Sequence, residues 1–327
     1  MSVRYRFNAL RAGAFKLDAG CMMGLIPRVV WSRSVPTDDR NRVTLCHNCL
    51  LLERLGTGPG PRLVVIEAGT GDKLDEASRK LFDLDGRWIQ TALDELGVAG
   101  ERIDAVVISH LHFDHAGGLT RKVRAGEEPE WVGPAGAFTG KEGAITHGVR
   151  RTFPNARVHV QRREWEDALA GRGMMTRTYF SDHILPLRGH IELADTPSPF
   201  TLADAGPEPA DPTRPERPDA ELETMIMPGI WVMRVPGHTW GQQAVRFEDE
   251  MGRMIVFTPD VMPTAWHAGR AYSLAYDVEP YTSMRSRGWL LRRACENGWL
   301  LYLDHEPGEP LRRVVSDGQG WWSLAPV

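Results

Sequence analysis

Short runs of aliphatic and β-branched residues recur along the chain, separated by polar stretches or by stretches rich in glycine and proline. Two of these runs, RVTLCHNCLLLE (42–53) and RLVVIEAG (62–69), flank the turn sequence GTGPGP, a pattern that predicts a β-hairpin. Short continuous apolar runs are also typical of buried strands. On this basis the sequence predicts further strands at residues 103–109, 158–161, 231–235, 254–257 and 300–303.

Two stretches favour helices instead. Within residues 74–97, apolar side chains recur at i, i+3, i+4 and i+7, namely at Ile89, Ala92, Leu93 and Leu96. The sequence REWEDALA (163–170) also predicts a helix. At 327 residues the chain can bury a large core, and its length allows one large domain or two smaller ones.

Four of the predicted strands end in histidine or aspartate. The strand at 103–109 runs into HLHFDH (110–115), and the three later strands run into PGHT (236–239), TPD (258–260) and DHE (304–306). Because α/β folds place their sites at strand ends along one edge of a sheet, we expect these residues to meet in space.

The HLHFDH stretch is the densest of these groups. His110, His112, Asp114 and His115 place three imidazoles and a carboxylate within six positions. Such groups at the edge of a core cost about 1 to 3 kcal/mol each if they find no partner. Imidazole and carboxylate are ligands that suit zinc and similar divalent ions. The stretch therefore predicts a metal site.

Composition and charge exclude several other classes. The chain is 42% hydrophobic and 25% charged, with a net charge of −4, which offers no general attraction for nucleic acid or an anionic membrane. No apolar run reaches the roughly 18 residues of a membrane span, and the first residues lack the apolar core of a signal peptide. We expect a cytoplasmic protein that acts on a small molecule; a homodimer is compatible with the sequence.

Two other features call for an interpretation. Cys46 and Cys49 match C-x-x-C, but on a strand they point to opposite faces, so a redox or structural-zinc pair is the minor alternative. Residues 195–224 carry seven prolines between Pro197 and Pro218, many acids and few apolar residues. We interpret this segment as an extended surface insertion within a single domain that spans residues 1–327.

The ordered set of motifs resembles the metallo-β-lactamase superfamily, whose pattern is HxHxDH, a histidine after a PG turn, an aspartate after a strand and a final histidine. The likeness covers nearly the whole chain. Its branch of predicted quorum-quenching lactonases is the most similar, because of LDAGCMMGLIPRVVW (17–31), LHFDHAGGL (111–119), FPNA (153–156), DVMPT (260–264) and AYDVEPYTS (275–283). The resemblance implies an α+β fold, an αββα four-layer sandwich, with a dinuclear metal site.

The resemblance also implies how seven side chains share two divalent ions, with zinc as the expected metal. The first metal is assigned to His110, His112 and His238, the second to Asp114, His115 and His305, and Asp260 bridges them. The chain departs from the usual pattern at Glu67, Gln242 and Pro263, where members have aspartate, a second histidine and, in the lactonases, tyrosine.

These ligands predict a hydrolase in which a metal-bridged hydroxide attacks an ester or lactone carbonyl, with acyl-homoserine lactones as candidate substrates. Asp114 is the predicted proton carrier. Tyr276 is the candidate phenol to replace the missing lactonase tyrosine, and the alternative is that it only packs. The expected pocket walls are Met262, Trp266, Tyr276 and Tyr281. The alternatives are a phosphotriester hydrolase, a di-iron redox protein, which His112 argues against, and a non-catalytic metal-binding protein.

Overall fold

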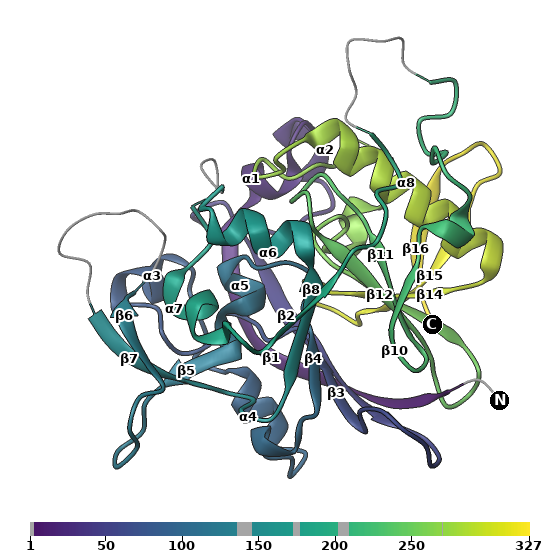
Figure 1. Ribbon diagram of the computed structural model, residues 1–327. Helices are drawn as coiled ribbons and strands as arrows, with labels where there is room; N and C mark the ends of the chain where they lie inside the picture. Colours follow the sequence, from purple (N-terminus) through teal and green to yellow (C-terminus); the bar gives the residue numbers. More distant parts are fainter. Residues whose placement is uncertain (1–2, 136–145, 173–176, 202–208, 270) are drawn as a thin grey trace. The chain divides into compact units, whose positions relative to one another are not determined.

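The computed structural model describes residues 3–135, 146–172, 177–201, 209–269 and 271–327 (Figure 1). The chain forms two compact units, each assembled from separate segments of the sequence. Unit 1 comprises Met1–Tyr5, Lys16–Leu45 and Asp195–Val327, and unit 2 comprises Arg6–Phe15 and Cys46–Ala194. Each unit has a sheet and a hydrophobic core of its own.

The main sheet of unit 2 has six strands in the order β1-β2-β3-β4-β8-β9. Their bounds are β1 Tyr5–Asp18, β2 Arg42–Arg54, β3 Leu63–Ile66, β4 Ala105–Val107, β8 Arg157–Gln161 and β9 Ile191–Ala194. Pairing of β2 with β3 is antiparallel, which confirms the hairpin, and β3, β4, β8 and β9 pair in parallel. Because parallel strands end at the same edge, Glu67, His110 and Glu164 follow their strands at one edge of this sheet.

The rest of unit 2 consists of short elements. They are the helices α3 Glu76–Leu81, α4 Ile89–Asp94, α5 Phe113–Ala116, α6 Arg162–Leu169 and α7 Ser181–Ile184, and the strands β5 Thr120–Lys122, β6 Trp131–Pro134 and β7 Thr146–Arg151, which form a three-stranded sheet in the order β5-β7-β6. The predicted strand at 158–161 and helix at 163–170 are confirmed by β8 and α6.

The prediction that residues 74–97 are helical is wrong for the middle of this segment. The chain forms α3 and α4 instead, and between them Asp83 and Gly86 adopt φ angles of 50° and 81°. Left-handed backbone cannot continue a right-handed helix, so the chain turns there. Ile89, Ala92 and Leu93 still share a buried face on α4, as their spacing predicts, whereas Leu96 lies beyond the helix and is exposed.

Unit 1 is built on a seven-stranded sheet in the order β10-β11-β12-β13-β14-β15-β16. The bounds are β10 Thr224–Met227, β11 Ile230–Arg234, β12 Gln243–Glu248, β13 Met254–Thr258, β14 Leu300–Leu303, β15 Leu311–Ser316 and β16 Trp322–Pro326. The predicted strands at 231–235, 254–257 and 300–303 are thus confirmed. β13 and β14 pair in parallel, so Asp260 and His305 follow strands that end at the same edge.

The long helix α8 (Pro280–Asn297), which the sequence pattern did not reveal, belongs to unit 1, as do the short helices α1 (Ala19–Met23) and α2 (Arg28–Trp31) (Figure 1). α8 begins with proline after Glu279, whose carboxylate caps the amides of Tyr281 and Thr282, and ends at Gly298 with φ 66°. Trp289 is buried in the core of unit 1. Several polar residues on the buried face of α8 hide the helical period of its apolar residues.

None of the described helices is long and apolar enough to cross a bilayer.

The proline-rich segment is anchored more firmly than its composition suggests. Residues 202–208 lie outside the described part of the chain, but on either side of them Phe200 and Leu222 are buried in the core of unit 1. The Arg285 guanidinium lies over the Phe200 ring, 4.1 Å from its centroid. Phe200 and Leu222 therefore attach the segment to unit 1 on either side of these residues.

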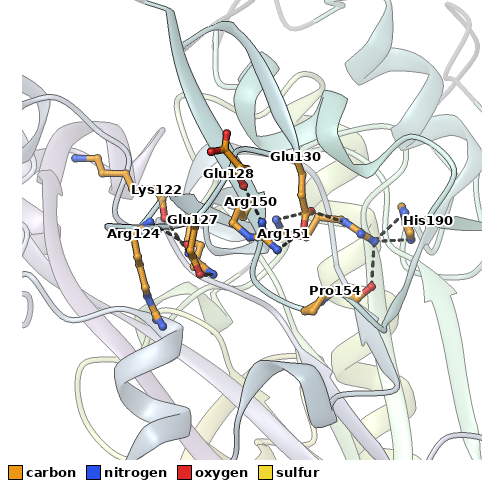
Figure 2. Close-up of polar contacts among 10 residues, drawn as sticks. Lys122, Arg124, Glu127, Glu128, Glu130, Arg150, Arg151, Pro154 and His190 are labelled. Carbon is orange, nitrogen blue, oxygen red and sulfur yellow. Dashed lines mark hydrogen bonds and ion pairs between the residues drawn. The ribbon is translucent and has the colours of Figure 1, made fainter.

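Arg150 and Arg151 are both paired with an acidic side chain (Figure 2). Arg150 and Arg151 both contact the Glu130 carboxylate, at 3.1 Å and 2.9 Å. Arg151 also lies 2.7 Å from the ring nitrogens of His190 and donates to the Pro154 carbonyl oxygen. Because Glu130 and His190 contact these guanidinium groups, the two arginines do not form an open basic patch.

Both cysteines of the C-x-x-C sequence lie within strand β2, as predicted. Cys46 and Cys49 are buried and neither is in a disulfide. The Arg11 guanidinium contacts the Cys46 thiol at 3.4 Å. A strand does not present two cysteines on a turn or a helix start, where redox and structural-zinc pairs place them, so the structural role of these residues is packing.

Candidate metal centre

The HLHFDH stretch leaves β4 at the sheet edge of unit 2 and enters the one-turn helix α5, whose N-cap is His112. The loop is pressed against the turn that follows β3. Ala68 N donates to the His115 carbonyl oxygen (3.1 Å), and Gly118 N donates to the Gly69 carbonyl oxygen (2.9 Å). A Cβ atom on Gly117 would collide with the Thr70 carbonyl, and one on Gly118 with the Ala68 carbonyl. Gly117 and Gly118 therefore permit a close approach that other residues would prevent.

Buried oxygens contact the Nδ1 atoms of two histidines in this stretch. His115 Nδ1 lies 3.0 Å from Glu67 Oε2, and His110 Nδ1 lies 3.0 Å from Ser109 Oγ. The Glu67 carboxylate also accepts from Ser109 N at 2.5 Å. A partner on Nδ1 fixes the ring orientation and leaves Nε2 as the ligand atom, as in many metal sites. Glu67, treated as a departure from the family pattern, thus holds a candidate ligand.

The imidazole rings of the stretch lie together. The centroid of the His110 ring is 4.5 Å from that of His112 and 3.9 Å from that of His115. Asp114 Oδ2 is 3.8 Å from His115 Nε2. Unit 2 therefore brings together the four predicted ligands of the HLHFDH stretch.

Unit 1 brings together the other three predicted ligands around a single carboxylate. Asp260 Oδ2 lies 3.1 Å from His238 Nε2, and Asp260 Oδ1 lies 3.3 Å from His305 Nε2. His238 Nδ1 contacts Asp277 Oδ1 at 2.9 Å, and Asp304 Oδ2 is 3.7 Å from His305 Nε2. Sequence reasoning did not assign Asp277 or Asp304 to the site, although both are acids close to motif residues.

The charges around His238 explain its protonation. Burial by itself lowers the pKa of this imidazole, but the Asp260 and Asp277 carboxylates outweigh burial and raise the pKa to about 10. A divalent cation on Nε2 would replace the proton that faces Asp260, while Nδ1 would keep its hydrogen bond to Asp277. Imidazoles with anchored Nδ1 atoms and a carboxylate with two available oxygens are a donor set that fits divalent metal ions.

The residues expected to line the substrate pocket differ in how far they are buried. Met262 is fully buried in the hydrophobic core of unit 1, so it is a packing residue and the expectation is wrong for it. Trp266, Tyr276 and Tyr281 are partly buried. Tyr276 directly precedes Asp277, the carboxylate that contacts His238.

Comparison with known proteins identifies the fold. The family model of the metallo-beta-lactamase superfamily matches residues 47–258, which cover most of the candidate ligands. The chain belongs to the metallo-beta-lactamase superfamily. The α+β fold class expected from the sequence is that of this superfamily. Among curated protein sequences, none matches the chain.

Three solved structures have the same fold. A probable metal-dependent hydrolase from Staphylococcus aureus is 22% identical, with a TM-score of 0.74 over 100% of this chain and 99% of that one. The hydrolase AbOPH of the beta lactamase superfamily is 17% identical (TM-score 0.64; 100% and 97% covered). AidC, a dizinc quorum-quenching lactonase in complex with the product N-hexanoyl-L-homoserine, is 13% identical (TM-score 0.66; 99% and 98% covered).

Proposed function

We propose that this superfamily member is a hydrolase that uses two divalent metal ions to open an ester or lactone. The observation that carries the proposal is the Asp260 carboxylate, with one oxygen facing His238 and the other facing His305. A carboxylate whose two oxygens face different imidazoles would be able to hold two metal ions together with those histidines.

The assignment of the other ligands rests on the resemblance to the superfamily. His110, His112 and His238 would hold one ion, and Asp114, His115 and His305 the other, with Asp260 shared. Imidazole and carboxylate ligands favour zinc as the metal. When bound, two such ions supply a water molecule that is activated near neutral pH and polarise the carbonyl oxygen of the substrate.

The side chains of the protein position and move protons. Glu67 and Asp277 hold the rings of His115 and His238 with Nε2 directed away from the anchored Nδ1. Asp114 is buried but keeps 8% of its surface exposed. An Asp114 oxygen that does not hold a metal would be able to carry a proton to the leaving group. The Tyr276 phenol is the proposed donor to the carbonyl oxygen as negative charge develops on it.

The proposed substrate is a lactone or ester, with acyl-homoserine lactones as the candidates. The support is the resemblance to quorum-quenching lactonases and the shared fold of a lactonase whose structure holds a homoserine product. A cytoplasmic location and a homodimer stay predictions from the sequence.

Metal analysis and a substrate panel test the proposal. We expect two metal ions per chain after reconstitution, and one after His112→Ala. The matched control is His190→Gln, because this histidine contacts Arg151 instead of the ligand residues and its replacement should retain both ions. One metal or none in the wild-type protein would refute the dinuclear site. Activity on phosphotriesters without activity on lactones or esters would refute the proposed substrate class.

A further inference from the structure

Glu164 is a carboxylate on the first turn of α6, in a sequence, REWED, whose charges suggest a solvated surface. Its neighbours Arg163 and Glu166 are exposed, but Glu164 itself is 0% exposed. Removing a carboxylate from water costs several kcal/mol in a typical protein interior unless hydrogen bonds replace the lost hydration. Glu164 must therefore have partners strong enough to keep it there.

Two hydrogen bonds accepted by Glu164 lead to the predicted ligands. Its Oε1 atom accepts from Leu111 N at 2.9 Å, and Leu111 is the residue between His110 and His112. The same oxygen accepts from the Tyr179 hydroxyl at 2.9 Å. The Tyr179 ring packs against the His112 ring, with centroids 5.3 Å apart and planes inclined at 56°. One carboxylate thus reaches the backbone between two candidate ligands and the phenol that covers one of them.

These contacts restrict the first half of the HLHFDH stretch. The chain has left β4 at Val107, so the Leu111 amide has no ladder partner and depends on Glu164 for its hydrogen bond. The Leu111 side chain is also fully buried in the hydrophobic core of unit 2. With its amide and its side chain both fixed, Leu111 cannot rotate, and the directions of the side chains on either side of it are set.

We propose that Glu164 and Tyr179 are positioning residues that set the affinity of the first metal site by fixing His110 and His112. The inference rests on the proposed function, because it requires that these histidines bind a metal. His115, in the second site, has its own partner in Glu67, so loss of Glu164 acts mainly on the first site.

Stepwise metal binding by the full-length chain tests the inference. Zn²⁺ or Co²⁺ is titrated against a competing chelator for the wild type and for Glu164→Gln, which keeps the size of the side chain but removes its charge. The matched control is Glu166→Gln, an exposed glutamate two residues further along α6. The metal that His112→Ala loses identifies the first site. Outer partners of metal ligands typically contribute about 10- to 100-fold in metal affinity.

We expect Glu164→Gln to weaken the first metal at least about tenfold and the second less than about threefold, with Glu166→Gln like the wild type. Tyr179→Phe keeps the ring on His112 and removes only the hydroxyl, so it should weaken the first metal in the same direction by a smaller factor. If Glu164→Gln does not fold, Tyr179→Phe alone decides the outcome. Equal weakening of both metals, or no change in the first, overturns the inference.

The wild-type titration separates this inference from the proposed function. A wild-type chain that binds one metal or none overturns the dinuclear site and the role of Glu164 with it. A wild-type chain that binds two metals, beside a Glu164→Gln protein of unchanged first-site affinity, overturns the role of Glu164 alone.

Discussion

Single atoms decide what the candidate ligands can do. In His115 and His238 a buried carboxylate occupies Nδ1, at 3.0 Å and 2.9 Å, so that each ring keeps Nε2 for a metal. Asp260 has two oxygens and faces a different imidazole with each. The residue types were predictable from HLHFDH, PGHT, TPD and DHE, but the atom that each side chain offers was not.

Tyr276 is the proposed replacement for the lactonase tyrosine that this chain lacks. Pro263, at the position of the lactonase tyrosine, has no donor, whereas the Tyr276 phenol precedes Asp277 in the unit that holds His238. We expect Tyr276→Phe to lower kcat on the best lactone at least about tenfold, which is about 1.4 kcal/mol of transition-state stabilisation. Metal content is measured in parallel and should stay at two. An unchanged kcat would remove Tyr276 from the mechanism.

At the scale of elements, the segment after Asp260 is held by two buried side chains. Arg287 of α8 donates to the carbonyl oxygens of Val261 (2.8 Å), Gly269 (3.1 Å) and Tyr272. His267 is fully buried, with Nε2 2.8 Å from the Met22 carbonyl oxygen and Nδ1 2.8 Å from Thr264 Oγ1. A neutral ring that donates from Nε2 to Met22 and accepts at Nδ1 from Thr264 satisfies both partners.

The neutral state of His267 makes stability depend on pH. Burial lowers the pKa of His267 from 6.5 to about 4. Below pH 6.5 the His267 side chain of the unfolded protein binds a proton, whereas the folded protein does not bind it until the pH nears the folded pKa of about 4. The free energy of unfolding therefore decreases as the pH is lowered from 6.5 to about 4.

Over that window we expect His267 to contribute a loss of up to about 3 kcal/mol, measured by urea unfolding between pH 7 and pH 4. His267→Gln should be less stable at pH 7 and should show a flatter pH dependence. Equal slopes for the variant and the wild type would assign the acid sensitivity to other groups.

The proline-rich segment gives a prediction at the same scale. Phe200 and Leu222 anchor its ends in the core of unit 1, and between them the sequence is rich in proline and acid. We expect limited proteolysis to cut first between Ala203 and Asp219 and to leave both metals bound, because the predicted ligands lie outside the segment. Earlier cutting elsewhere would show that the segment is folded. Loss of metal on cutting would show that the segment supports the metal site.

At the scale of the whole molecule, the chain passes from one unit to the other several times, and each unit contributes part of the predicted ligand set. If ligands of both units bind the same ions, metal removal should lower the stability of both units together. A ligand present at 100 times its Kd adds about 2.7 kcal/mol to the free energy of unfolding.

We therefore expect chelation to lower the Tm by at least about 5 °C and readdition of Zn²⁺ to restore it. Hydrogen–deuterium exchange of peptides from each unit follows the two units separately. A shift confined to one unit would contradict a shared site. That the chain forms a single domain stays a prediction.

The sequence by itself determined several of the strands and the residue types available as donors, but it did not reveal α8. Local patterns predicted the hairpin and the strands that end in His and Asp, because periodicity and strand ends are short-range features. The resemblance to the superfamily supplied the set of seven candidate ligands. Only the tertiary structure decided which atoms those ligands present, since Glu67, Asp277 and Glu164 reach their partners across 48, 39 and 53 residues of sequence. Folding alone brings such distant side chains together, so no local pattern could predict that these acids are buried.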